Sequence, residues 1–316
     1  MRVVVTGAAG FIGSHLCERL LIDGHDVLGI DAFIPYYARE IKESNLCQSL
    51  SHDRFRFIDS DLRHDELVDH VAEADVIVHL AAQAGPASWS QFDLYVTCNL
   101  SATQRLLEAT RVAGDIDKRR FVHISTSSVY GTEALGDETS RLQPASPYGI
   151  TKLAAEQLAL AYHQSYGLPA TVLRYFSIYG PRQRPDMAYH LFIQALLADE
   201  PITIFGDGEQ TRGNTYIDDC VDGTVRAIAK GVPGEIYNIG GGAPVSLNAA
   251  ITILEETTGK RAERRYVGAR IGDQRHTLAD IRKARAHLGF APAITPTEGL
   301  PRQVEWQMTQ QAPGSG

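Results

Sequence analysis

The stretch RVVVTGAAGFIG, residues 2–13, decides the fold of this chain. Its first half is a run of β-branched residues, which is typical of a buried strand. Its second half spaces Gly7, Gly10 and Gly13 three residues apart, and an amphipathic stretch at 14–23 that we expect to be helical follows. Bare backbone and the amino terminus of a helix together attract a phosphate. This order predicts a dinucleotide site, although three glycines alone would also fit a plain tight turn.

Outward from this stretch, short β-branched runs alternate with longer helical patterns. The runs lie at residues 26–31, 54–59, 75–82, 120–126 and 170–176. Strands that alternate with helices predict an α/β fold with a doubly wound parallel sheet of the Rossmann type. Beyond residue 176 the alternation loosens. We therefore expect residues 1–176 to form the nucleotide domain and residues 215–240 to return to it. Residues 177–316 should form mainly a smaller C-terminal α/β substrate lobe, which includes a helix near 187–199.

The composition narrows the class of protein. The chain has 316 residues, of which 44% are hydrophobic and 22% charged, and its formal charge is −8. This charge argues against a nucleic-acid binder, which needs clustered Lys and Arg, and no apolar run is long enough for a membrane helix. The cysteines stand far apart, so we expect reduced thiols and no metal site. These cysteines are Cys17, Cys47, Cys98 and Cys220. Residues 1–13 are too rich in glycine and too quickly polar for a signal peptide, so we expect a cytoplasmic protein.

Asp31 indicates which dinucleotide to expect. It ends the second predicted strand, where a carboxylate can accept both ribose hydroxyls and would repel a 2′-phosphate, so the expected cofactor is NAD rather than NADP. A helix cap or turn is the alternative role for Asp31. Asp61 and Leu62 are expected near the adenine, and a capped strand end is an equal interpretation for Gln83. The full set expected at the cofactor is Gly7, Gly10, Phe11, Ile12, Gly13, Asp31, Asp61, Leu62, Ala81, Ala82, Gln83, Asn99, Tyr148 and Lys152.

Two further patterns carry reactive side chains. Tyr148 and Lys152 stand four residues apart at the start of a predicted helix, so the phenol and the ammonium share one helical face. A phenol with a pKa of about 10 is a poor base at neutral pH, and a nearby ammonium favours the phenolate. Any amphipathic helix can contain this spacing by chance. The stretch STSSVYG, residues 125–131, adds four hydroxyls at the end of a predicted strand.

Together these motifs resemble the extended short-chain dehydrogenase/reductases, specifically the nucleotide-sugar epimerases and dehydratases. The resemblance covers nearly the whole chain through GAAGFIG, LAAQAG, SSVYG, SPYGITK, RYFSIYGP, GDGEQTR and TYIDD, in the family's order. It implies that Tyr148 is the catalytic acid and base. It also implies that Lys152 tunes Tyr148 and contacts the ribose, and that Thr126 hydrogen-bonds the O4 atom of the sugar. The implied reaction is transient oxidation at C4 by NAD, rotation of the sugar and reduction on its other face.

Two serines indicate which reaction of the family to expect. Relatives that eliminate water across C5–C6 carry acidic groups just after the equivalent of Thr126, and the UDP-glucuronate decarboxylases place a glutamate at the second of these positions. Here Ser127 and Ser128 stand there, and neither can act as an acid or base at neutral pH. The resemblance therefore favours 4-epimerisation.

The segment YGPRQRPDM, residues 179–187, indicates the substrate. Arginine suits a carboxylate because it can form two parallel charge-assisted bonds. With AQAGPASW and FIPYYAREIKESNL, this segment resembles the UDP-glucuronate 4-epimerases. That likeness implies that Arg184 holds the C6 carboxylate, with help from Ser177 and the hydroxyls at 126–128. The alternatives for Arg184 are solvation in a surface loop and pairing with Asp186.

The family's diphosphate and uridine contacts have counterparts in the C-terminal half. Arg212 resembles the diphosphate ligand, and Arg270 with Asp273 resembles the contacts to the diphosphate and the uridine ribose. The chain departs from the family where Gly213-Asn214 replace an Asp and an aromatic residue, and where Ser177 replaces Asn or Thr. The first departure bears on the packing of the loop and the geometry of the diphosphate site, and the change at Ser177 weakens the substrate assignment more than the reaction type.

Other functions stay open. A UDP-glucose/UDP-galactose 4-epimerase would need no carboxylate clamp, and a 4,6-dehydratase or an NAD-binding regulator without catalysis is less favoured. The predicted helices at 102–114 and 151–167 are rich in alanine and leucine on more than one face. The family often pairs these helices in a four-helix bundle, so we expect a homodimer, although a well-covered core helix would look the same.

Overall fold

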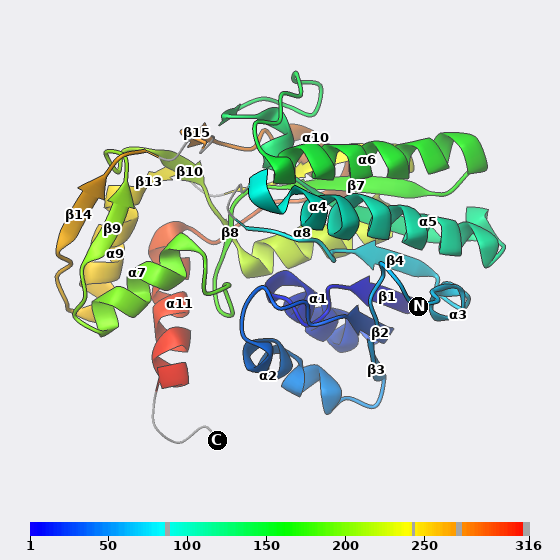
Figure 1. Ribbon diagram of the computed structural model, residues 1–316, viewed down its shortest axis with the longest axis horizontal. Coiled ribbons are helices and arrows are strands. Elements are labelled where there is room, and N and C mark those ends of the chain that lie inside the picture. The colour runs from blue at the N-terminus through cyan, green and yellow to red at the C-terminus, as the bar shows by residue number, and fades with distance from the viewer. Residues whose placement is uncertain (86–88, 242–243, 270–273, 312–316) are drawn as a thin grey trace.

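Seven short strands pair into one parallel sheet, which confirms the predicted α/β doubly wound fold (Figure 1). The computed structural model describes residues 1–85, 89–241, 244–269 and 274–311. In sheet order the strands are β12 (Ile236–Ile239), β7 (Ala170–Tyr175), β5 (Arg120–Thr126), β4 (Val76–His79), β1 (Arg2–Thr6), β2 (Asp26–Asp31) and β3 (Phe55–Asp59). The order reverses between β1 and β4. A sheet of this kind has its crevice at that reversal, outside the carboxyl ends of the strands.

Helices cover both faces of the sheet, because successive strand residues point to opposite sides. In β1, Val3 and Val5 belong to the core shared with α1, whereas Val4 belongs to the core on the α5 side. One layer holds α1 (Phe11–Ile22), α2 (Arg39–Leu50) and α8 (Ile217–Lys230), and the other holds α3 (Val68–Val71), α4 (Phe92–Tyr95), α5 (Ala102–Val112) and α6 (Pro147–Tyr166). Among the helices in the described ranges, none combines the length and apolar character that crossing a membrane requires.

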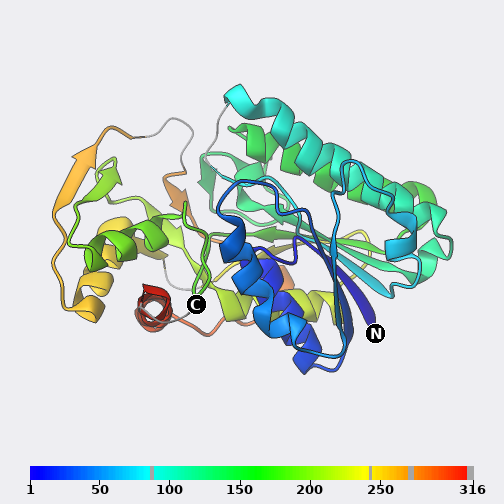
Figure 2. The same cartoon turned by 60° about the horizontal axis from the view of Figure 1, so that its bottom comes forward.

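The C-terminal half builds a smaller lobe beside the sheet (Figure 2). Its helices are α7 (Ala188–Leu197), α9 (Leu247–Thr258) and α11 (Pro296–Gln311), whereas α10 (Arg282–Leu288) packs against α8 and β12. The short strands pair as β9 (Ile202–Phe205) with β14 (Arg264–Val267), as β8 (Ile178–Tyr179) with β11 (Thr215–Tyr216), and as a sheet of β13 (Pro244–Ser246), β10 (Thr211–Gly213), β15 (His276–Thr277) and β6 (Glu133–Ala134). The segment expected to return to the sheet contributes α8 and the edge strand β12.

The first helix begins three residues earlier than its amphipathic pattern predicts. Gly10, in an extended conformation, is the residue before the helix, and Ser14 lies within it with its hydroxyl bonded to the Phe11 carbonyl at 3.1 Å. Gly13 permits the early start, because a Cβ there would collide with the carbonyl oxygen of Gly7. The glycine turn therefore leads straight into helical N–H groups, without a side-chain cap in the way.

Helix α6 is held in place at its start and along its buried face. Ser146 caps it by accepting a hydrogen bond from the Gly149 N–H at 3.1 Å, and Pro147 occupies the first turn. One turn beyond Lys152, Glu156 forms a fully buried ion pair with Arg174 of β7, at 2.6 Å, and accepts a bond from Ser125 of β5 at 2.8 Å. Breaking a buried pair leaves an uncompensated charge, so this contact fixes α6 on the two central strands.

Candidate active site

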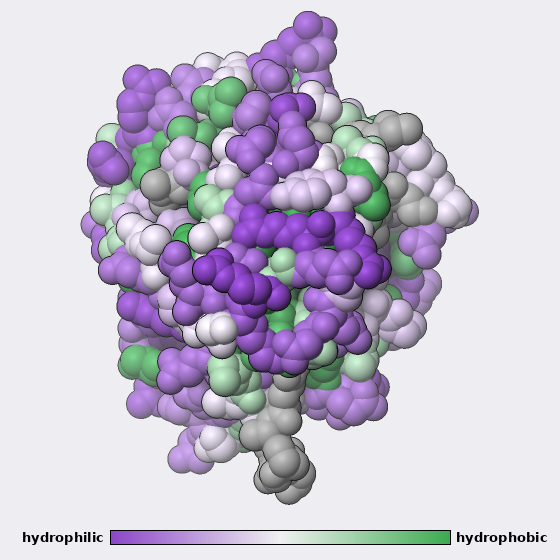
Figure 3. All heavy atoms as spheres, turned by 90° about the vertical axis from the view of Figure 1, so that its left-hand side faces the viewer, coloured by the Kyte–Doolittle hydropathy of each residue, from purple (hydrophilic) through white to green (hydrophobic). Residues whose placement is uncertain are grey.

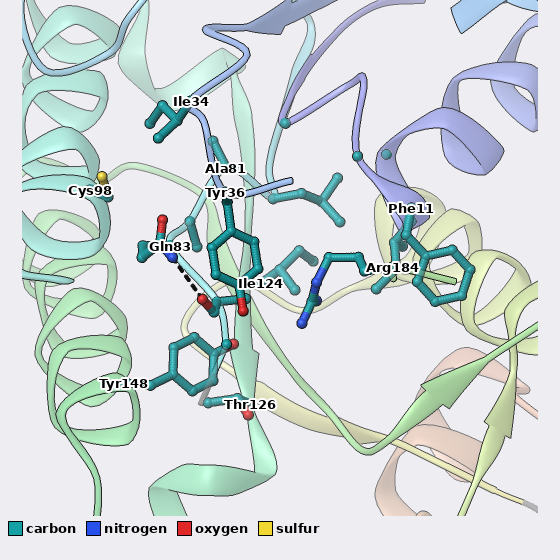
Figure 4. Close-up of a pocket in the computed structure, with 18 of the residues that line it drawn as sticks. Phe11, Ile34, Tyr36, Ala81, Gln83, Cys98, Ile124, Thr126, Tyr148 and Arg184 are labelled. Atoms are coloured by element: carbon teal, nitrogen blue, oxygen red, sulfur yellow. Dashed lines mark hydrogen bonds between the residues drawn. The ribbon is translucent and has the colours of Figure 1, made fainter. Parts of the chain in front are cut away.

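A cavity of about 760 Å³ opens at the carboxyl ends of the central strands. It is lined from the nucleotide side by the glycine turn and from the other side by the loop before α7 (Figure 4). Most of the predicted site residues line it: Gly7, Gly10, Phe11, Ile12, Gly13, Asp31, Asp61, Leu62, Ala81, Ala82, Gln83, Thr126, Ser127, Ser128, Tyr148, Lys152, Ser177 and Arg184. The sheet thus brings together motifs that are far apart in the chain.

The glycine turn fits a dinucleotide pyrophosphate. Gly7 has a positive φ of 71°, and a Cβ there would lie 2.9 Å from the Ala81 nitrogen, so a side chain would strain the turn and press on the β4 loop. The start of α1 has no side-chain cap. Free N–H groups at a helix amino terminus, next to a turn whose glycines carry no side chain, form an anion site.

Asp31 is held ready for a ribose at the end of β2. Its carboxylate oxygens accept hydrogen bonds from the N–H groups of Ala9, at 3.1 Å, and Phe33, at 2.9 Å. Burial raises the pKa of Asp31 above its usual value, and the charge of Lys42 opposes that rise. A carboxylate at this position accepts hydroxyl donors and repels a phosphate, which fits NAD better than NADP.

Two of the residues expected at the cofactor have additional or different partners. Asp61 lines the cavity, but its carboxylate pairs with Arg63 at 2.6 Å, and this hydrogen bonding lowers the pKa of Asp61. Asn99 is not among the lining residues. Its amide accepts a bond from the Gln83 N–H at 2.7 Å and donates to the Thr151 hydroxyl at 3.1 Å. Asn99 therefore holds the cavity wall against α6 and does not face the cavity.

Tyr148 and Lys152 lie on one face of α6 and both line the cavity, as their spacing predicts. Burial raises the pKa of Tyr148, and the positive charge of Arg184 and a hydrogen bond with Thr126 oppose that rise. In this structure the positive charge of Arg184 favours the phenolate of Tyr148 by opposing the rise in its pKa. The sequence pattern assigned this role to Lys152. Burial lowers the pKa of Lys152 to about 8, against a smaller opposing effect of Glu156.

The buried charge of Lys152 should lower the free energy of unfolding of the protein. Below pH 8 the folded protein holds a buried ammonium, and between pH 8 and the usual value of 10.5 the folded protein releases a proton that the unfolded chain keeps. We expect Lys152→Met to raise the free energy of unfolding at pH 7 by roughly 3 kcal/mol, the equivalent of this shift. The gain should shrink as the pH approaches 10. Urea unfolding of nucleotide-free protein from pH 7 to 10 measures it, and a gain that is independent of pH would contradict this account.

Thr126, the last residue of β5, and the two residues that follow it line the cavity with hydroxyls and without an acid among them. Thr126 accepts a bond from the Ser128 N–H at 3.2 Å, which turns the chain into the short 3-10 helix Ser127–Tyr130. Its hydroxyl also lies 3.3 Å from the Ser128 hydroxyl. Gln274 lines the cavity beside them and donates to the Gly131 carbonyl at 2.7 Å. This arrangement can hold a sugar or a carboxylate, but it offers no proton donor for elimination.

Arg184 reaches the cavity from the smaller lobe, and its Nε and Nη2 atoms bond the two carboxylate oxygens of Asp186 at 2.9 and 3.1 Å. The hydroxyl of Tyr36 donates to the same carboxylate at 2.9 Å. Pairing with Asp186, the alternative left open by the sequence, is therefore present. Arg184 nevertheless lines the same cavity as Tyr148, and its positive charge acts on the phenol.

The remaining predicted substrate contacts are only partly placed. Ser177 lines the cavity, whereas Arg212 is not among its lining residues and bonds the Thr211 and Arg275 carbonyls at 3.1 Å. Arg270 and Asp273 lie outside the described residues. The sequence reasoning missed the roles of Tyr36, Arg63 and Gln274. The segment FIPYYA after β2 places Tyr36 near the end of that strand, but nothing in the segment predicts its contact with Asp186.

Comparisons with known proteins agree with this geometry. A family model described as the NAD dependent epimerase/dehydratase family matches residues 3–240. The chain is 44% identical over 311 residues to the uncharacterized UDP-glucose epimerase YtcB of Bacillus subtilis, covering 97% of this chain and 98% of that protein. It is 40% identical over 310 residues to a UDP-glucuronate 4-epimerase of Thermodesulfobacterium geofontis, covering 96% and 95%. A crystal structure of UDP-glucuronic acid 4-epimerase from Bacillus cereus with UDP-glucuronic acid and NAD superposes with a TM-score of 0.94, at 44% identity over 98% of this chain and 100% of that one.

Proposed function

The chain belongs to the NAD-dependent epimerase/dehydratase family, and from this we propose that it interconverts UDP-glucuronate and UDP-galacturonate with NAD as cofactor. The choice of substrate rests on the position of Arg184, whose side chain lines the cavity. Arg184 lines the cavity together with Tyr148 and residues 126–128, and its positive charge acts on the phenol. A neutral sugar would need neither this cation nor so many donors around its C6 group.

The residues of the chain divide the work of the reaction. Asp31 would hold the adenosine ribose and the glycine turn the pyrophosphate; when bound, NAD supplies reversible acceptance of the C4 hydride. Tyr148 takes the O4 proton as C4 is oxidised and returns it afterwards, and its pKa must fall from its raised value for this. Arg184 and the hydrogen bond with Thr126 favour the phenolate. The buried Lys152 contributes an ammonium below pH 8.

The direct test is to incubate the purified protein with UDP-glucuronate and to follow the sugar by NMR. We expect the galacto isomer to form, with little CO₂ or pentose. No turnover of UDP-glucuronate, together with ready turnover of UDP-glucose, would replace this function with the runner-up.

That runner-up, a UDP-glucose/UDP-galactose 4-epimerase, has one observation in its favour. Asp186 already neutralises Arg184, so in this structure the guanidinium is not free to hold a substrate carboxylate. The name of the Bacillus subtilis relative points the same way. Against it stands the position of the pair, inside the cavity next to the reacting phenol.

Ser128→Glu should change the products. Oxidation of C4 in a uronate makes a β-keto acid, which loses CO₂ readily, and a carboxylic acid beside the sugar adds a group that can transfer protons and repel the substrate carboxylate. We expect this variant to release several-fold more CO₂ and pentose per epimerised sugar, measured by the same NMR assay. Ser128→Ala is the matched control and should not increase decarboxylation. An unchanged product ratio in Ser128→Glu would contradict this view of the hydroxyl cluster.

We also propose a homodimer that forms through α5 and α6, in the cytoplasm. Large apolar side chains are exposed at the end of α5 (Val112) and on α6 (Ile150 and Tyr166). The opposite end of the molecule, at α7, α9 and β14, is largely hydrophilic (Figure 3), although Leu191, Tyr266 and Val267 are exposed there. The four free cysteines fit a reducing compartment. Light scattering should give twice the chain mass of 34.6 kDa, and a monomer would refute the dimer.

A further inference from the structure

Arg184, which we propose binds the substrate carboxylate, is already paired with the carboxylate of Asp186. Both of its oxygens bond the guanidinium of Arg184, in the fork geometry that a uronate carboxylate would also use. The two side chains are only 23% and 29% exposed. Arg184 and Asp186 line the same cavity as Tyr148, so the pair lies at the reaction site and not on the outer surface.

Tyr36 fixes this carboxylate from the opposite lobe. It follows β2, and its hydroxyl donates to Asp186 at 2.9 Å across the cavity. Figure 4 shows Tyr36 and Arg184 projecting into the cavity from different parts of the fold. The ring passes over Gly85, where a Cβ would collide with the tyrosine hydroxyl, and the Arg184 guanidinium lies 5.8 Å from the ring centre. Asp186 therefore keeps a partner even when Arg184 turns away from it.

The proposed reaction requires such an exchange. The hydride leaves one face of C4 and returns to the other, so the sugar must turn over within the cavity. Its carboxylate cannot keep the same two bonds to Arg184 throughout. A guanidinium in a largely dehydrated cavity is costly without a counter-ion. Among the residues that the structure describes, Asp186 is the only carboxylate that is paired with Arg184.

We propose that Asp186 is a positioning residue that exchanges with the substrate carboxylate on Arg184, and so releases the uronate for rotation. This inference rests on the proposed function and adds the step that the arginine alone does not explain. With Tyr36 as its second partner, Asp186 waits within reach while the substrate is bound. It then receives Arg184 again when the sugar turns.

Asp186→Asn tests the exchange. Removing the competing charge should tighten the hold on the substrate and slow its release. We expect KM and the calorimetric dissociation constant for UDP-glucuronate to fall, and kcat to fall by roughly tenfold, the size of one charge-assisted bond. Inhibition by UDP-glucose, which has no carboxylate, should not change. Tyr36→Phe leaves Asp186 charged but without its second partner while the substrate holds Arg184. Asp186 should then compete better for the guanidinium, so KM for UDP-glucuronate should rise in this variant.

The matched control is Asp280→Asn. Asp280 and Arg282 form the same kind of two-bond pair at the same spacing but are not among the lining residues of the cavity, and their side chains are 21% and 84% exposed. This variant should match the wild type in KM and kcat. A higher KM or an unchanged kcat in Asp186→Asn would overturn the exchange, because it would show that Asp186 only orients Arg184 or is idle. Wild type that leaves UDP-glucuronate unchanged would instead refute the proposed function, and the inference with it.

Discussion

Tyr148→Phe should lower kcat on UDP-glucuronate by about 10³-fold or more, at the upper end of what a positioned acid or base contributes. The Tyr148 phenol lines the cavity together with Arg184 and the hydroxyls of residues 126–128, and phenylalanine has no proton to exchange. Binding should persist, because the ring and the packing of α6 stay the same. Initial rates and calorimetric titration of UDP-glucuronate measure the two effects separately.

A control on the same helix separates chemistry from folding. Tyr166 lies at the other end of α6 and is 51% exposed, so Tyr166→Phe should retain full activity. If Tyr148→Phe kept activity within tenfold of the wild type, another group would have to be the acid and base. A loss of binding as large as the loss of rate would show that the substitution had damaged the cavity.

Arg184→Gln should reduce kcat/KM for UDP-glucuronate by roughly 30- to 100-fold, which corresponds to hydrogen bonds to a charged group worth about 2–3 kcal/mol. Part of that loss would come from the unpaired carboxylate of Asp186, with which Arg184 now forms two bonds. The double variant Arg184→Gln/Asp186→Asn removes this complication and should show a loss of the same order. Steady-state kinetics on UDP-glucuronate and on UDP-glucose give the comparison.

The uncharged sugar makes this test specific. UDP-glucose cannot form an ion pair at C6, so its inhibition or slow turnover should change less than threefold in the double variant, well under the energy of one charge-assisted bond. Equal losses on both sugars would mean that Arg184 acts mainly through the phenol of Tyr148. If the kinetics on both sugars stayed the same as in the wild type, the result would favour a UDP-glucose 4-epimerase.

The sequence was sufficient for the elements that depend on local pattern. The alternation of strands and helices predicted the parallel sheet, and the i, i+4 spacing put Tyr148 and Lys152 on one face. The start of α1 was misplaced because its amphipathic pattern begins only at Ser14, while glycine at 10 and 13 allows the helix to begin at Phe11. Helix α7 was nearly right, at Ala188–Leu197 against a predicted 187–199.

Contacts between distant segments could not be predicted in this way. Tyr36 and Asp186 are 150 residues apart, and neither stands in a periodic segment that would relate one to the other. Asn99 was expected at the cofactor. Its amide is instead used up by Gln83 and Thr151, a result that depends on how α6 packs beside the β4 loop. The sequence shows which groups are present but not which of them satisfy each other.

The amide of Asn99 has a consequence for redesign of this scaffold. Because it bonds both main-chain groups of Gln83 and the hydroxyl of Thr151, which itself bonds the Pro147 carbonyl, one side chain joins the nucleotide wall to the turn that carries Tyr148. Positions 99 and 151 are therefore not independent choices. A library that varies either alone should yield mostly inactive clones, and functional sequences should appear as matched pairs.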